Sequence, residues 1–190
     1  MTRSEGAEER IRRDQERANE LVDEGRFTQA AEILQSLLED RSLTDRLTAH
    51  RRRRIRQNLG TFYFLGSDYR NALDVYTTLL TELREQPGVS DDVILDCRFM
   101  AANCRVELGE GVAAVAELRD LIREYEMMLP VDHERLLELR VLLGMLLLQT
   151  DGVQARELFE NVLITQGSSH AEPYVVQAQH HLDRLDELGQ

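Results

Sequence analysis

Apolar residues recur along the chain at intervals of three and four positions, the spacing that places side chains on one face of an α-helix. The first such series, which a turn at Gly25 divides, comprises Leu21, Val22, Ala30, Ile33, Leu34, Leu37 and Leu38. Equivalent series predict four helix pairs and one further helix, over about 8–40, 45–85, 91–128, 132–165 and 169–188. The composition, with three prolines and no tryptophan, disfavours a strand-rich fold. We therefore predict an all-α protein with nine helices.

The chain also repeats itself at an interval of 42 residues. Three arginines have this spacing, at Arg56, Arg98 and Arg140, and each is followed four positions later by a small residue, at Gly60, Ala102 and Gly144. The second helix of each pair has its own small residue, at Ala30, Ala72, Ala114 and Ala155. Because large side chains would hold the helices apart, we expect close crossings at Gly60–Ala72 and Gly144–Ala155. Such self-similarity is typical of helical repeat proteins and predicts one domain over 1–190.

The segment Asn58–Leu80, NLGTFYFLGSDYRNALDVYTTLL, resembles a tetratricopeptide repeat. The signature places of that family are occupied by Leu59, Gly60, Tyr63, Tyr69, Ala72, Tyr76 and Leu79. An ordinary repeat has about 34 residues, and the longer spacing here is similar to that of the subclass found in kinesin light chain and many bacterial regulatory proteins. The segment Leu129–Leu147, in which a Pro-x-Asp-His connector precedes an Arg-x-x-Leu-Gly helix, supports the match. The resemblance covers about 10–164 and implies a right-handed α-solenoid of four helical hairpins plus a C-terminal capping helix.

The resemblance implies a function as well, because the first helices of tetratricopeptide pairs line a concave groove that binds an extended peptide or a helix of a partner protein. The positions expected in this groove are Arg12, Gln15, Asn19, Arg54, Gln57, Asn58, Thr61, Phe64, Phe99, Met100, Asn103, Val141, Met145 and Leu148. Amides such as Asn58 and Asn103 can pair with the backbone of an extended ligand. The alternative is that these residues are solvated or packed against the neighbouring repeat.

The expected groove is uneven, with arginines and amides in the first two repeats and apolar residues in the last two. A matching protein or peptide partner would carry an acidic or phosphorylated segment followed by apolar anchors. The resemblance implies a non-catalytic scaffold or adaptor in bacterial regulation or signalling, either alone or as the sensory part of a kinase or transcriptional regulator. The alternatives are a receptor for a peptide pheromone and a protein that self-assembles as a homo-oligomer.

Basic residues are concentrated in the segment His50–Arg56, HRRRRIR. On a helix these arginines spread over about 200°, so two or three at most can reach one ligand group. In the structural interpretation, Arg52 and Arg56 pair with acidic residues of the first repeat, such as Glu32, Glu39 and Asp40; the other interpretations are an acidic or phosphorylated peptide and a nucleic acid. We expect the arginines of the 42-residue series to pack between helices, with guanidinium groups bound to carboxylates or carbonyls.

The net charge of −12 at pH 7 argues against a nucleic-acid partner. The chain has no phosphate-binding loop, nucleophile elbow or His-Glu-x-x-His motif, so we predict neither an enzyme nor a cofactor. Cys97 and Cys104 lie about 10 Å apart along one helix face, too far for a disulfide, and are expected to be reduced, buried thiols rather than metal ligands. His180 and His181 point about 100° apart on a helix and cannot easily share a metal.

The amino-terminal segment is charged throughout, and no apolar stretch approaches the ~20 residues of a membrane-spanning helix. We therefore expect no membrane partner and a cytoplasmic location. All 23 basic residues other than histidine are arginine, a bias that we interpret as codon usage in a GC-rich bacterial genome.

Local signals mark several helix boundaries. Ser90 and Asp92 are expected to mark the start of one helix, and Asp132 to cap another. Pro130 should end the helix before it, and the spacing of Ser169 to Glu172 suits a capping box. The last helix should cover the end of the array by burying Val175, Ala178, Leu182, Leu185 and Leu188 against Leu158, Phe159 and Val162.

Overall fold

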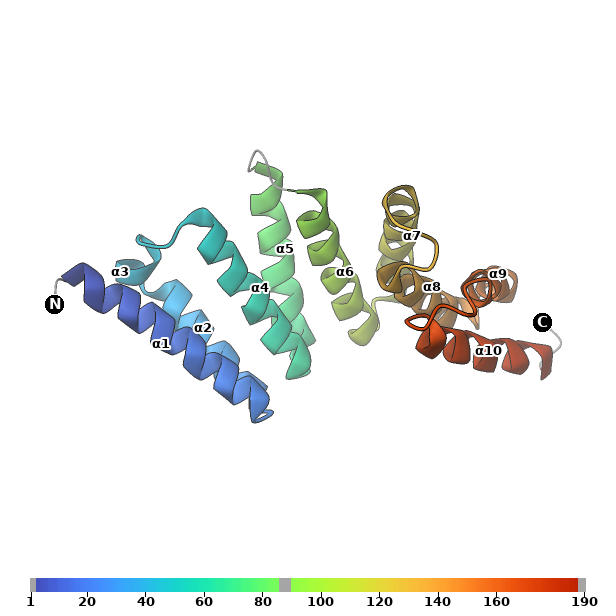
Figure 1. Ribbon diagram of the computed structural model, residues 1–190, viewed down its shortest axis with the longest axis horizontal. Helices are drawn as coiled ribbons and strands as arrows, with labels where there is room; N and C mark the ends of the chain where they lie inside the picture. The colour runs from blue at the N-terminus through green and yellow to red at the C-terminus, as the bar shows by residue number, and fades with distance from the viewer. Residues whose placement is uncertain (1–2, 86–89, 188–190) are drawn as a thin grey trace. The chain divides into compact units, whose positions relative to one another are not determined.

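The computed structural model describes residues 3–85 and 90–187, and within these two ranges all regular secondary structure is helical (Figure 1). The helices there are α1 (Arg3–Asp23), α2 (Phe27–Glu39), α3 (Arg41–Thr44), α4 (Ala49–Leu65), α5 (Tyr69–Glu85), α6 (Asp91–Glu107), α7 (Gly111–Met128), α8 (Glu134–Leu147), α9 (Gly152–Leu163) and α10 (Glu172–Glu187). The all-α prediction is confirmed. The expected number of helices was too low by one, because the connection before α4 contains the single-turn helix α3.

The helices form two compact units, Met1–Gly109 and Glu110–Gln190, which are described separately. In the first unit, α1 packs on α2, α2 on α4, α4 on α5 and α5 on α6. In the second unit, α8 packs on α7 and α9, and α10 packs on α9 and α8. Each helix therefore buries its apolar face against its neighbours, as a repeat architecture requires. A single domain over the whole chain stays a prediction.

The core of the first unit follows the helical period seen in the sequence. Helix α2 buries Ala30, Ala31, Leu34 and Leu37, which lie on one face and belong to the same cluster as Ile55, Leu59 and Phe62 of α4. A second cluster joins α5 to α6 through Ala72, Tyr76, Leu79, Leu83, Cys97, Ala101 and Cys104. Helix α4 belongs to the first cluster through Ile55, Leu59 and Phe62, and its Tyr63 and Phe64 pack against the second.

Aromatic rings lie against the glycines of two helix crossings. A Cβ added at Gly60 would stand 2.8 Å from Cζ of Tyr76, and one added at Gly144 would stand 2.6 Å from Cε1 of Phe159. Both distances are shorter than van der Waals contact, so only glycine allows the two helices to approach this closely. The expected close crossings are present, but the facing side chain at each glycine is the aromatic residue one turn after the alanine that we predicted.

The turns between paired helices repeat a left-handed residue at the 42-residue interval. Gly25 has a φ of 73°, Ser67 a φ of 60° and Gly109 a φ of 74°. The left-handed region is open to glycine but costs other residues free energy. The turn before α9 is made differently, because Asp151 has a φ of −150° and its carboxylate caps the helix by accepting from the Gln154 N–H.

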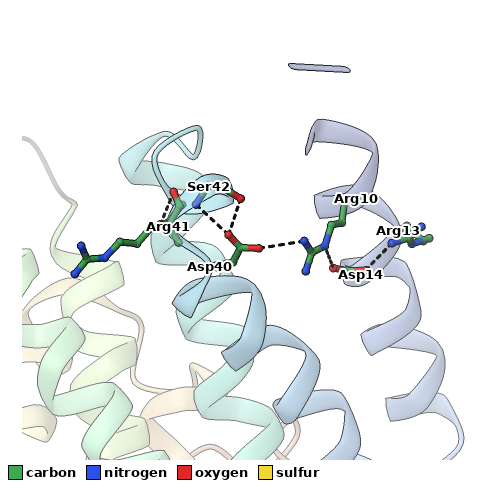
Figure 2. A network of polar contacts seen from close by, with 7 residues as sticks. Arg10, Arg13, Asp14, Asp40, Arg41 and Ser42 are labelled. Atoms are coloured by element: carbon green, nitrogen blue, oxygen red, sulfur yellow. Dashed lines mark hydrogen bonds and ion pairs between the residues drawn. The ribbon is translucent and has the colours of Figure 1, made fainter. Parts of the chain in front are cut away.

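A polar network at Asp40 explains why the chain forms α3 (Figure 2). The Asp40 carboxylate accepts from the backbone N–H of Ser42 at 3.0 Å and from its hydroxyl at 2.6 Å, and so caps the short helix. Its other oxygen accepts from Arg10 of α1 at 3.1 Å, and Arg10 also pairs with Asp14. The Ser42 hydroxyl is the main reason why the pKa of Asp40 is lowered. The expected pairing of Asp40 with Arg52 or Arg56 was wrong, because Arg10 is the arginine that reaches it.

The connector between α7 and α8 differs from the expected capping. Leu129, which precedes Pro130, is extended with φ −123° and ψ 154°, and α7 ends there as predicted. The cap of α8 is His133 rather than Asp132, since the His133 ring nitrogen Nδ1 accepts from the Arg135 N–H at 3.2 Å. The Asp132 carboxylate instead accepts from the Ser168 hydroxyl at 2.9 Å and so holds the connection before α10.

Helix α10 covers α9 and part of α8, as expected of a helix that ends the array. Ala178, Leu182 and Leu185 are buried, and the His181 ring stacks on Phe159 with centroids 5.1 Å apart. The helix begins at Glu172 rather than near Ser169, and Leu188 lies outside the described residues.

We predict that Gly144→Ala costs about 1–3 kcal/mol of unfolding free energy, because the new methyl group must displace a ring that is fully buried. Urea unfolding would measure this cost. Replacing Phe159 by leucine in the same chain should recover part of the lost stability in a double-mutant cycle. A Gly144→Ala protein with an unchanged midpoint would contradict the crossing described here.

We also predict that Gly109→Ala costs about 1–2 kcal/mol, because alanine is strained at this positive φ although space for its methyl group is available. Gly111, two residues later, is the matched control: it has an ordinary φ, lies at the start of α7 and has equal space. Gly111→Ala should therefore be neutral or stabilising. Equal losses for the two substitutions would show that backbone strain at Gly109 is not the cause.

Candidate peptide-binding surface

Polar side chains of α1 and α4 line a pocket of about 340 Å³ in the first unit. Five of the residues predicted for the groove are among its lining, namely Arg12, Gln15, Asn19, Arg54 and Asn58. On α1 they are three and four positions apart, and on α4 four apart, so each helix presents them on one face. Glu16 and the buried Leu34 of α2 complete the lining.

The two arginines of this pocket differ in their ion-pair partners. Arg12 is paired with Glu9 at 2.6 Å and with Glu16 at 2.8 Å, and its hydrogen bond is the main reason why the pKa of Glu9 is lowered. The guanidinium group of Arg54 makes no hydrogen bond or ion pair with any part of the chain that the structure describes. Arg54 is therefore the cation of this pocket that is available to a ligand.

Two amides in the pocket are available in the same way. Neither Asn19 nor Asn58 forms a side-chain hydrogen bond with residues 3–85 or 90–187. The amide oxygen of Gln15, in contrast, accepts from Arg51 at 3.3 Å, and Arg51 also pairs with Glu8 at 2.6 Å. Arg51 thus ties α1 to α4, while Asn19 and Asn58 each keep two donors and an acceptor for a ligand.

The other predicted groove residues of α4 take part in packing. Gln57 donates to Sγ of Cys97 at 3.8 Å, and the Thr61 hydroxyl donates to the Gln57 carbonyl at 3.0 Å. Thr61 is also hydrogen-bonded to the Tyr76 hydroxyl at 3.0 Å, and burial raises the pKa of Tyr76 to about 12. Phe64 contacts Tyr69 edge to face and packs on the cluster between α5 and α6.

Phe99 of α6 is buried, with 2% of its surface exposed, and this corrects its prediction as a groove residue. The physical reason is that α6 is apolar on more than one face, with buried residues at Leu95, Cys97, Phe99, Ala101, Ala102 and Cys104. Met100 is half-buried against the α5–α6 cluster. The Asn103 amide donates to the Phe99 carbonyl at 3.1 Å, within its own helix.

In the second unit, Val141 is 4% exposed, so its prediction as a groove residue is corrected in the same way. Helix α8 packs against α7, α9 and α10, and three neighbours cover most of its circumference. Met145, at 45% exposure, is accessible, and Leu148 is half-buried. Of Val141, Met145 and Leu148, Met145 is the most exposed to solvent.

The arginines of the 42-residue series confirm the structural interpretation where their contacts are described. Arg140 is buried, donates to Glu126 at 2.9 Å and donates to the Val131 carbonyl at 3.2 Å. Arg56 pairs with Glu82 of α5, not with an acidic residue of the first repeat. The Arg52 guanidinium donates to the Thr44 carbonyl at 2.7 Å, so the partners that we predicted for these two arginines were wrong.

Cys97 and Cys104 are free and buried, which confirms their predicted state. Burial raises the pKa of each thiol to about 11, so both stay protonated and unreactive near neutral pH. Across residues 3–85 and 90–187, His, Cys, Asp and Glu side chains do not gather in a group that could hold a metal ion. In the same ranges, each helix is too short or too polar to cross a membrane.

The helix pairs, their 42-residue period and their close crossings at small residues define a tetratricopeptide-type repeat fold. No protein-family model matches the sequence, and no curated protein matches it either. Similarity is found among solved structures, at sequence identities so low that they show the fold alone.

One similar structure contains the nearly identical TPR-like repeats of a protein described as a kinesin light chain from Podosopora anserina. It is 21% identical with a TM-score of 0.73, over 95% of this chain and 88% of that one. A tetratricopeptide repeat protein from Parabacteroides merdae is 21% identical with a TM-score of 0.63, over 94% of this chain and 62% of that one. The third is BtubC (BKLC) from P. vanneervenii, 15% identical with a TM-score of 0.66, over 90% and 76% of the two chains. These likenesses confirm a tetratricopeptide fold that resembles kinesin light chain repeats.

We predict that Phe99→Ala lowers the unfolding free energy by about 3–5 kcal/mol, because it removes a buried ring and leaves a cavity. Met145→Ala should cost much less, since that side chain is already half in solvent. Denaturant unfolding of the two variants tests the assignment of Phe99 to the core. A larger loss for Met145→Ala would restore Phe99 as a surface anchor.

Proposed function

We propose that this protein is a non-catalytic interaction module that binds an extended peptide or a helix of a partner protein at the pocket between α1 and α4. The proposal rests on one observation: three polar side chains that form no hydrogen bond with the described residues, Arg54, Asn19 and Asn58, line the same pocket. A side chain that is bonded to another part of the protein must break that bond to recognise a ligand, whereas these three have no such bond with residues 3–85 or 90–187 and exchange only water. The tetratricopeptide fold is consistent with such a role.

The charges in the pocket favour a carboxylate side chain in the bound segment. In this pocket Arg12 is paired with Glu9 and Glu16, whereas Arg54 pairs with no carboxylate of residues 3–85 or 90–187. A single guanidinium group matches a singly charged carboxylate in charge and geometry. The two amides would pair with the backbone on either side of that residue, as they do for extended ligands in general. We further propose a regulatory role in a bacterial cytoplasm; the arginine-only composition supports the bacterial source alone.

The test uses peptides selected from a random displayed library on the full chain, then synthesised and measured by fluorescence anisotropy. We predict that selected peptides contain Asp or Glu and that Arg54→Gln weakens their binding by about tenfold or more, the usual loss for a charge-assisted hydrogen bond. The loss should shrink as salt is raised, because the site is exposed. Asn58→Ala should weaken binding at every salt concentration.

The matched control is Arg53→Gln, which makes the same change of charge at the neighbouring residue. Arg53 does not line the pocket between α1 and α4, so its substitution should leave the affinity of unphosphorylated peptides unchanged. Equal losses for Arg53→Gln and Arg54→Gln would mean that net charge, rather than this pocket, attracts the peptides. Equal affinity for Arg54→Gln and the unchanged protein would remove the pocket as the binding site.

A further inference from the structure

A second face of α4 carries three arginines around a small cavity. Arg52, Arg53 and Arg56 line a cavity of about 130 Å³ together with Ala49 and, from α5, Leu79, Glu82 and Leu83. At about 100° per residue, these arginines lie within an arc of about 100° on the helix, with Arg56 between the other two. Arg54 points about 160° away from Arg56, toward the pocket already described. The cavity between α4 and α5 is therefore separate from the peptide-binding surface.

The guanidinium groups around this cavity are incompletely paired. Arg56 is paired with Glu82. Arg52 donates to the neutral carbonyl of Thr44, while its Nε is buried and has no hydrogen-bond partner among residues 3–85 and 90–187. Arg53 makes neither a hydrogen bond nor an ion pair with the described residues. Three cations thus face one carboxylate, and two positive charges and a buried donor are left unmatched.

The unmatched groups carry a cost in the absence of an anion. Leu79 and Leu83 are buried at the base of the cavity, and the accessible lining, to which the three arginines and Glu82 contribute, is mostly polar. Like charges side by side repel, and a buried donor without an acceptor carries a desolvation penalty. A bound anion with several acceptor oxygens would remove both penalties together.

Size and charge identify the class of anion. The cavity of about 130 Å³ is several times the volume of one water molecule, so it has room for a phosphate group. Two unmatched positive charges balance a dianion. Guanidinium groups bind tetrahedral oxyanions through paired N–H donors, which is why arginine is preferred at such sites.

We propose that the cavity lined by Arg52, Arg53 and Arg56 binds a dianionic phosphate group, either as free inorganic phosphate or as part of a phosphorylated side chain. Arg53 contributes a guanidinium that no carboxylate neutralises, and Arg52 contributes its unpaired Nε–H. Glu82 holds Arg56 in place at the edge of the cavity. This site binds a phosphate group, whereas the pocket between α1 and α4 binds peptides that need not be phosphorylated.

The first experiment titrates inorganic phosphate into the full chain by isothermal calorimetry at pH 7.5, with sodium chloride keeping the ionic strength constant. The expected result is one saturable site whose affinity falls at least tenfold in Arg53→Gln. The neighbouring substitution Arg54→Gln makes the same change of charge on the other face and should alter the affinity by less than twofold. Because Arg53 forms no hydrogen bond or ion pair with the described residues, its variant should keep the helical circular dichroism of the unchanged protein.

The second experiment separates the two sources of phosphate with a pair of peptides, one containing phosphoserine between alanines and one containing serine. A phosphoserine peptide that binds at least tenfold more tightly than inorganic phosphate, and loses this affinity in Arg53→Gln, assigns the site to a phosphorylated side chain. Equal binding of peptide and free ion assigns it to the ion. The serine peptide should not bind at this site.

Three results would overturn the proposal: no saturable phosphate binding, equal binding by Arg53→Gln, or equal weakening by Arg53→Gln and Arg54→Gln. Preferential binding of a single-stranded oligonucleotide over phosphate would also overturn it, in favour of an extended basic surface. Failure here leaves the peptide pocket standing, since that pocket is tested with unphosphorylated peptides and depends on Arg54.

Discussion

The packing of an aromatic ring directly on a glycine backbone is the contact on which the arrangement of two helix pairs, α4–α5 and α8–α9, depends. At Gly60 and Gly144 the helices are so close that a methyl group would overlap Tyr76 or Phe159. The ring fills the space that a side chain at the glycine would occupy, so both helices bury apolar surface in the same contact. Ala72 and Ala155, which lie one turn before each ring, are fully buried at the same crossings.

The helical spacing of apolar residues and the residues typical of turns predicted most of the helices within a few positions. Both signals have local causes. Helical spacing needs one sequence window, and turns such as that at Gly109 need one left-handed residue. Features that depend on contacts between distant residues were missed. The helix α3 forms because Asp40 caps it and is held by Arg10, which lies 30 positions away. His133 caps α8 because Asp132 is engaged by Ser168, 36 positions later.

The sequence likewise predicted the local part of the candidate site and missed the part that depends on contacts between helices. The repeat alignment identifies which positions of α1 and α4 share a face, and five of these line one pocket. It does not show how many neighbours cover each helix, and this decides whether an apolar residue is an anchor or part of the core. Phe99 and Val141 are aligned with surface positions but are buried, because α6 and α8 are apolar on more than one face.

The location of both proposed sites on α4 has a common physical origin. Helix α4 buries four residues, Ile55, Leu59, Gly60 and Phe62, whereas α8 buries eight around most of its circumference. A helix with few buried residues leaves much of its surface free for charged groups, and in α4 those groups include consecutive arginines. Arg51 and Arg56 hold neighbouring helices, while Arg53 and Arg54 line different pockets and pair with no carboxylate of the described residues. Because the same sequence cluster thus contains both structural and unpaired cations, the partner of each arginine, rather than the cluster itself, indicates where an anionic ligand can bind.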